Sequence, residues 1–247
     1  MPGNTPWCTG GTDKLYLQSG QFSGTIKTSL SVSAVDAATQ DVAWDGTNTP
    51  WTGSQSGKLY LQSGQFSGTL KTSRDVTAKD TTPSGISFSN GHTPWCGLVG
   101  DNLFLQSGQF SGTIKTSRDM TAIDNSPHGI SWDGTNTPWT GVQADKLYLQ
   151  SGQFSAAMKT SLGVTTIDVD PRGISWDQSN TPWCGLGDDK LYLQSGQFSG
   201  TVKTSRATVA VNPTGIENTN RLAAQPSAVA KLPMAVVVAG PCMPSMT

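Results

Sequence analysis

The sequence predicts an all-β protein built from five copies of one four-stranded unit. First, Thr-Pro-Trp recurs with a constant spacing of 44 residues, at Trp7, Trp51, Trp95, Trp139 and Trp183. Second, the 247 residues include 28 Gly and 14 Pro but only 13% charged residues, a composition that is foreign to helical bundles. Third, each copy holds short runs of alternating apolar and polar residues, as in Lys58–Gln62 and Thr69–Thr72, and these are typical of strands.

Each copy contains four such runs in a fixed order. A Gly-Ile-Ser-Trp-Asp-Gly segment comes first, Asn-Thr-Pro-Trp second, Lys-Leu-Tyr-Leu-Gln-Ser-Gly-Gln-Phe third and Gly-Thr-Ile-Lys-Thr-Ser fourth. The segments between them carry the Gly, Asn and Asp that tight turns require. Each copy therefore predicts one blade of four antiparallel strands.

The two ends of the chain predict that the blades close into a ring. The first copy begins at Thr-Pro-Trp7 and lacks the Gly-Ile-Ser-Trp run, and the missing run reappears as 213–217 after the fifth copy. An open stack would need atypical capping repeats at both ends. We therefore expect the C-terminal run to be the innermost strand of the first blade. Asn218 replaces the aromatic residue found in the other copies, so we expect a shorter closing strand.

This arrangement resembles the five-bladed β-propellers, with tachylectin-like rings among them. The resemblance rests on the repeat number, the repeat length and the offset of the ends, and it implies a propeller over residues 1–220 with a C-terminal extension or docking arm over 221–247. The sequence of the repeats, with DGTNTPW and KLYLQSGQFSGT in near-identical copies, resembles that of uncharacterised repeat proteins of marine bacteriophages and bacteria. That likeness implies a virion or surface protein.

The aromatic residues lie in register, and we expect the Trp and Tyr rings to pack between blades. Gln-Ser-Gly-Gln-Phe is identical in all five copies and should form the turn between the third and fourth strands. The candidate ligand-binding residues are the last Gln and the Phe of each copy: Gln21, Phe22, Gln65, Phe66, Gln109, Phe110, Gln153, Phe154, Gln197 and Phe198. In one interpretation they form five shallow sugar sites, in which Gln hydrogen-bonds a sugar and Phe stacks on it. In the other, Gly shapes the turn and Phe fills the gap beneath it.

The remaining polar residues predict structure rather than chemistry. Asx-type backbone hydrogen bonds are expected for one set in register: Asp36, Asp80, Asp124, Asp168 and Asn212. Cys8, Cys96 and Cys184 should be buried free thiols. His92 and His128 appear as substitutions at exposed turns. The sequence therefore offers few candidate catalytic residues, and we predict that the chain is not an enzyme. No spacing predicts a metal site, and no cofactor is expected.

Charge and hydropathy limit the partners. Lys and Arg number 16 against 17 Asp and Glu, which argues against nucleic acid, and no apolar run is long enough to insert in a membrane. The start of the chain lacks the regions of a signal peptide, so we expect synthesis in the cytoplasm and a later location on a virion or in the extracellular medium. In the C-terminal arm, Met234, Val236, Val237 and Val238 are expected to dock on another protein of a larger assembly.

The sequence thus predicts a non-enzymatic structural or binding module, expected as a bacteriophage virion surface component, a decoration, tail or fibre-associated protein, that is anchored by its C-terminal arm. The alternative is a multivalent carbohydrate-binding lectin with up to five equivalent sites.

Overall fold

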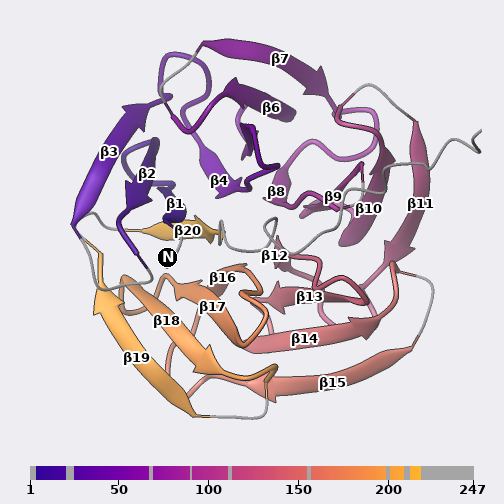
Figure 1. Ribbon diagram of the computed structural model, residues 1–247. Coiled ribbons are helices and arrows are strands. Elements are labelled where there is room, and N and C mark those ends of the chain that lie inside the picture. The colour runs from indigo at the N-terminus through magenta and orange to yellow at the C-terminus, as the bar shows by residue number, and fades with distance from the viewer. Residues whose placement is uncertain are drawn as a thin grey trace, which may run out of the picture.

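The computed structural model describes residues 4–20, 25–66, 69–89, 91–110, 113–154, 157–198, 201–208 and 212–217. These residues form strands and turns without a helix. Twenty strands make five antiparallel four-stranded sheets, which stand as blades around an axis (Figure 1). The predicted five-bladed β-propeller is confirmed.

Each blade has four strands, ordered from the axis to the rim. The innermost strands are β20 (Pro213–Ile216), β4 (Thr39–Val42), β8 (Pro83–Ile86), β12 (Pro127–Ile130) and β16 (Pro171–Ile174). The second strands are β1 (Thr5–Thr9), β5 (Asn48–Gly53), β9 (His92–Gly97), β13 (Asn136–Gly141) and β17 (Asn180–Gly185). The third strands are β2 (Lys14–Gln18), β6 (Lys58–Ser63), β10 (Asn102–Ser107), β14 (Lys146–Ser151) and β18 (Lys190–Ser195). The outermost strands are β3 (Ile26–Ser31), β7 (Leu70–Asp75), β11 (Ile114–Asp119), β15 (Met158–Gly163) and β19 (Val202–Ala207).

The ring closes where β20 joins β1 in the first blade. The two strands pair antiparallel, with Trp7 opposite Ile216 and Cys8 opposite Gly215, and the Glu217 N–H donates to the Pro6 carbonyl at 2.9 Å. The predicted closure by the C-terminal run is therefore confirmed.

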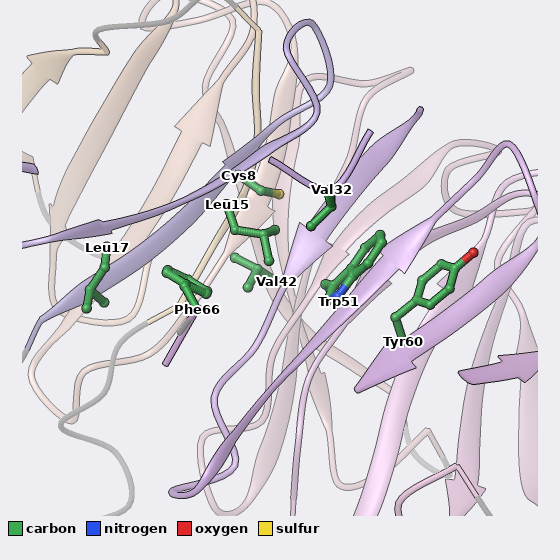
Figure 2. Close-up of a cluster of buried hydrophobic side chains, with 8 residues drawn as sticks. All are labelled: Cys8, Leu15, Leu17, Val32, Val42, Trp51, Tyr60 and Phe66. Atoms are coloured by element: carbon green, nitrogen blue, oxygen red, sulfur yellow. The ribbon is translucent and has the colours of Figure 1, made fainter. Parts of the chain in front are cut away.

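The core is divided among the five interfaces between blades. In every blade the Thr-Pro-Trp indole stacks on the Tyr or Phe of the third strand, with ring centroids 4.1–4.3 Å apart. Figure 2 shows one interface, in which Trp51 of the second blade lies toward Leu15 of the first and Tyr60 lies beyond Trp51. Phe66, also of the second blade, lies beside Leu17 of the first. Burial of rings of this size is a main source of stability. The expected packing between blades is thus confirmed for the Thr-Pro-Trp and third-strand Tyr rings, whereas Trp44 and Trp176 are only partly buried.

Around the axis, the innermost strands approach one another at glycines. A Cβ on Gly129 would overlap the carbonyl oxygen of Arg172 in the next blade, and a Cβ on Gly173 would overlap the backbone of Gly215. Such contact between backbones requires residues without side chains. Asp41 is the exception at this position, and its carboxylate accepts hydrogen bonds from the backbone N–H groups of Val42 and Ile86 at 2.8 and 2.9 Å.

Candidate functional site

The ring has two faces with different connections. We call "turn face" the one that carries the turn between innermost and second strands, such as 43–47, and the Gln-Ser-Gly-Gln-Phe turn between third and outermost strands. We call "link face" the one that carries the turns between second and third strands, such as 54–57, and the links between blades, such as 76–82. The predicted location of the Gln-Ser-Gly-Gln-Phe turns agrees with this topology.

The candidate residues of these turns serve the ring itself. The side chains of Phe66, Phe110, Phe154 and Phe198 are only 3–5% exposed, so they offer no open face on which a sugar could stack. Each of these Phe residues adopts a φ of 63–66°, a left-handed conformation that is unusual for a bulky residue. The structure therefore supports the interpretation in which Phe fills the gap beneath the turn.

The last Gln of the turn reaches the preceding blade. Gln153 Nε2 donates to Ser89 Oγ at 2.8 Å, and the amides of Gln109 and Gln197 donate to the carboxylates of Asp45 and Asp133. Gln65 is half-buried in its turn. Two candidate residues, Gln21 and Phe22, lie outside the described residues, as do all four candidate docking residues of the C-terminal arm.

On the link face, four of the links between blades each carry one aspartate whose carboxylate is hydrogen-bonded to the next blade. Asp168 accepts hydrogen bonds from the backbone N–H groups of Asp170, Gly187 and Asp188 at 2.9–3.0 Å and from the Tyr192 hydroxyl at 3.1 Å. Asp36, Asp80 and Asp124 make the corresponding backbone contacts, which confirms the expected Asx-type bonds. Placing Asn212 in this set was wrong, because the link before β20 is two residues shorter than the other links, and the Asn212 N–H donates to Asp189 instead.

The sequence suggested that His128 lies at an exposed turn, and this prediction is wrong. His128 belongs to β12, is 7% exposed, and its Nδ1 donates to the Ser126 carbonyl at 3.2 Å. Its Nε2 accepts from the guanidinium of Arg172, which is also paired with Asp170 at 2.6 Å. Burial and the nearby Arg172 charge lower the pKa of His128 to about 3. A neutral ring held on both nitrogens acts as a clamp between the fourth and fifth blades.

The three described cysteines are free and buried, as predicted. Cys96 Sγ donates to the His128 carbonyl at 2.9 Å, and Thr52, at the same position in the second blade, donates to the Ser84 carbonyl at 3.1 Å. Burial raises the pKa of the Cys96 thiol, so it stays protonated and unreactive.

Within the described part of the chain, the side chains do not form a metal-binding cluster, and the secondary structure does not include a membrane-spanning helix. No three His, Cys, Asp or Glu side chains gather there as a possible metal site. Nor does that part contain a helix long and apolar enough to span a bilayer.

A cleft of about 330 Å³ lies at the rim between the second and third blades. The second blade contributes Arg74, Val76 and Lys79, and the third blade contributes Gln106, Thr113 and Ile114. Arg74 crosses the interface, since its Nη1 donates to the Phe110 carbonyl at 3.2 Å. In Figure 1 this is where the end of β7 meets the start of β11. The volume is that of a small-ligand site, and we take this cleft as the candidate functional site.

Comparison of the interfaces explains why the cleft is here. Between the fourth and fifth blades, Leu162 and Ile167 stand at the positions of Arg74 and Lys79 and pack against the core together with Val202. Between the third and fourth blades, Ile123 at the position of Lys79 and Met158 at the position of Ile114 pack against the core, and Arg118 stands at the position of Arg74. At the cleft, Ile114 is the partly buried hydrophobic residue that packs against the core cluster. Each of the other interfaces has at least one apolar residue at these two positions, whereas here both positions carry charged side chains, Arg74 and Lys79.

The sequence contains a signal for this site that lies outside the repeated motifs. Lys79 interrupts an otherwise apolar register of Val35, Ile123 and Ile167. A charge at a position that is apolar in the other copies marks a local change of role, but only the packed blades show that Arg74 and Lys79 border one cleft.

No protein-family model and no curated protein sequence matches this chain. Solved structures do match in fold. A streptogramin B lyase is 15% identical, with a TM-score of 0.53 over 85% of this chain and 71% of that one. A chain of a nidogen/laminin complex is 15% identical, with a TM-score of 0.57 over 83% and 80%. Glutaminyl cyclase of Myxococcus xanthus is 10% identical, with a TM-score of 0.52 over 75% and 72%. At such identities the likeness establishes the fold alone.

These matches correct one prediction. The sequence predicted that the chain is not an enzyme, yet the solved structures of similar fold include two enzymes, a lyase and a cyclase. The prediction is therefore wrong as drawn, because this architecture also supports catalysis and a scarcity of sequence motifs does not exclude it.

Proposed function

We propose that this ring is a glycan-binding module and that its sugar is bound in the cleft between the second and third blades. The single observation that carries the proposal is the cleft itself, with a volume of about 330 Å³. Its size suits one or two sugar rings, and ligand sites of this kind combine apolar walls with a few polar groups.

The lining offers both kinds of contact that a sugar needs. The partly buried side chain of Ile114 provides apolar surface for the C–H face of a ring, and Arg74 and Thr113 provide polar groups for its hydroxyls. The other two lining residues on this side, Val76 and Gln106, are themselves buried. Because the filling residues differ at the other interfaces, the proposal predicts one site per chain. This differs from the five equivalent sites expected from the repeated turns.

Titration calorimetry with a panel of neutral and acidic mono- and disaccharides tests the proposal. We expect binding with a stoichiometry of one, and loss of that binding on Thr113→Trp, which places a bulky ring at the edge of the cleft. Thr201→Trp, at the same position in the fifth blade, is the matched control and should bind as the natural chain does. Fivefold stoichiometry, or equal loss in both variants, would refute this site.

The setting we propose for the module is the surface of a virion, with residues 221–247 as its attachment. Two features of the sequence support this setting: the likeness of the repeats to bacteriophage repeat proteins, and the apolar run Met234–Val238. Truncation after Asn220 should leave a folded ring that no longer sediments with purified particles. If the natural chain itself sediments alone from infected cells, the setting is wrong.

A further inference from the structure

We infer that the cleft between the second and third blades selects a ligand that carries an anionic group, a carboxylate or a phosphate, through Arg74 and Lys79. The inference rests on the proposed function and specifies its ligand class.

The charge of the cleft is peculiar to this interface. The two positions hold Leu30 and Val35, Arg118 and Ile123, Leu162 and Ile167, and Arg206 and Val211 at the other interfaces. Two cations come together only between the second and third blades. Where like charges converge on a concave site, an oppositely charged ligand relieves their repulsion and gains charge-assisted hydrogen bonds.

Arg74 is oriented toward such a ligand by its own contact. One of its five N–H donors is engaged by the Phe110 carbonyl at 3.2 Å. This bond holds the guanidinium across the interface, half-buried, with Lys79 exposed on the neighbouring link. A guanidinium fixed in this way loses little further entropy when it binds a planar carboxylate.

Asp75 also borders the cleft, and its charge opposes an anion. Its Oδ1 accepts hydrogen bonds from the Thr77 N–H at 2.9 Å and the Thr77 hydroxyl at 2.6 Å, and these bonds lower the pKa of Asp75. The carboxylate is therefore ionised and directed to its own link. The lining keeps a net charge of +1 from two cations and one anion.

Three probes separate the charge from the sugar: glucuronate, glucose and inorganic phosphate. We expect glucuronate to bind roughly tenfold or more tightly than glucose, because a hydrogen bond between ions is worth more than one between neutral groups. Lys79→Gln and Arg74→Gln should each remove most of this preference, whereas Arg118→Gln, at the same position in the next blade, should leave it. Added salt should weaken the binding of glucuronate more than that of glucose.

The outcomes distinguish the two proposals. Equal binding of glucose and glucuronate would overturn the charge inference and leave glycan binding standing. Phosphate binding that depends on Arg74 and Lys79, with no sugar bound, would overturn the glycan proposal and support the inference. If none of the three probes binds the natural chain, both are wrong.

The repeat allows a test by transplantation. Leu162→Arg with Ile167→Lys copies the two cations to the interface of the fourth and fifth blades, and we expect the stoichiometry for glucuronate to rise from one to two. The reverse pair, Arg74→Leu with Lys79→Ile, should close the natural cleft and abolish binding while circular dichroism shows a folded ring. A closed-cleft variant that still binds glucuronate would overturn the inference.

Discussion

In the first blade the innermost strand comes from the far end of the chain, whereas in the other four blades a turn of the chain joins the innermost strand to the second. In the first blade, β20 is therefore joined to β1 by strand pairing and not by a turn of the chain. The difference is visible in side chains as well as in topology.

One such difference lies on the link face. In four blades a glycine ends the second strand beside the anchoring carboxylate, and a Cβ on Gly185 would overlap Asp168. The first blade has Thr9 at this position, and its Oγ1 lies 2.7 Å from that of Thr12. Counted back from the proline of the innermost strand, the sequence has Ala210 where the others have Asp. In the sequence, the glycine and the carboxylate are thus replaced together.

A second difference lies at the axis, where acidic side chains flank β20. Asp41, in β4 on one side, receives a hydrogen bond from the Ile216 backbone. Glu217, directly after β20, accepts from the Ser175 hydroxyl of the other neighbour at 2.6 Å. The corresponding residues elsewhere are Gly for Asp41 and Ala or Ser for Glu217. The strand that lacks a covalent turn to its partner is bonded on both sides by carboxyl groups.

The largest expected effect comes from removing β20. Truncation after Val211 should lower the free energy of unfolding by roughly 4 kcal/mol or more, because it exposes the partners of Ile216 and leaves the edge of β1 unpaired. Truncation after Asn220, which keeps β20, should change stability little. Thermal unfolding followed by circular dichroism compares the two. Equal melting temperatures would mean that β20 does not close the ring.

The hydrogen bonds of the link face should contribute unequally to the free energy of unfolding in different blades. Asp168→Ala should cost about 3 kcal/mol, because three backbone N–H groups and a tyrosine hydroxyl lose one buried acceptor. Thr9→Ala in the first blade should cost about 1 kcal/mol, since one hydroxyl pair is lost. Urea denaturation measures both. A Thr9→Ala loss as large as that of Asp168→Ala would refute this difference between blades.

The acidic side chains beside β20, Asp41 and Glu217, should make the free energy of unfolding depend on pH. Burial raises the pKa of Asp41 well above its usual range, and the nearby Glu217 adds to the shift. A raised pKa contributes stability that is complete below the unfolded pKa, near 4, and is lost as the pH rises through the folded pKa. The natural chain should therefore lose stability with rising pH relative to Asp41→Asn, by up to roughly 1.4 kcal/mol per pH unit within that window.

Denaturation at a series of pH values measures this difference. Glu217→Gln removes a charge that raises the pKa of Asp41, so its decline should end at a lower pH than that of the natural chain. Parallel curves for the natural chain and Asp41→Asn would exclude Asp41 as the titrating group.

The sequence predicted the architecture of the ring correctly, but it predicted only some of the contacts between side chains. The Trp stacks and the closing strand follow from register, because equivalent residues of a repeat occupy equivalent places. The role of the repeated Phe was left open, since the direction of a side chain in a turn depends on its φ and on the neighbouring blade. His128 was misplaced because Pro127 suggested a turn, whereas both residues belong to an innermost strand with an irregular register.

By itself, the sequence determined the number of blades, the order of their strands and the end that closes the ring, because local periodicity and turn residues decide these features. Only the tertiary structure decided which copies of a repeated position meet. Arg74 reaches Phe110 across an interface, and Asp41 contacts strands from two other blades. Such contacts join residues far apart in the chain and depend on how neighbouring blades pack, which no local pattern records.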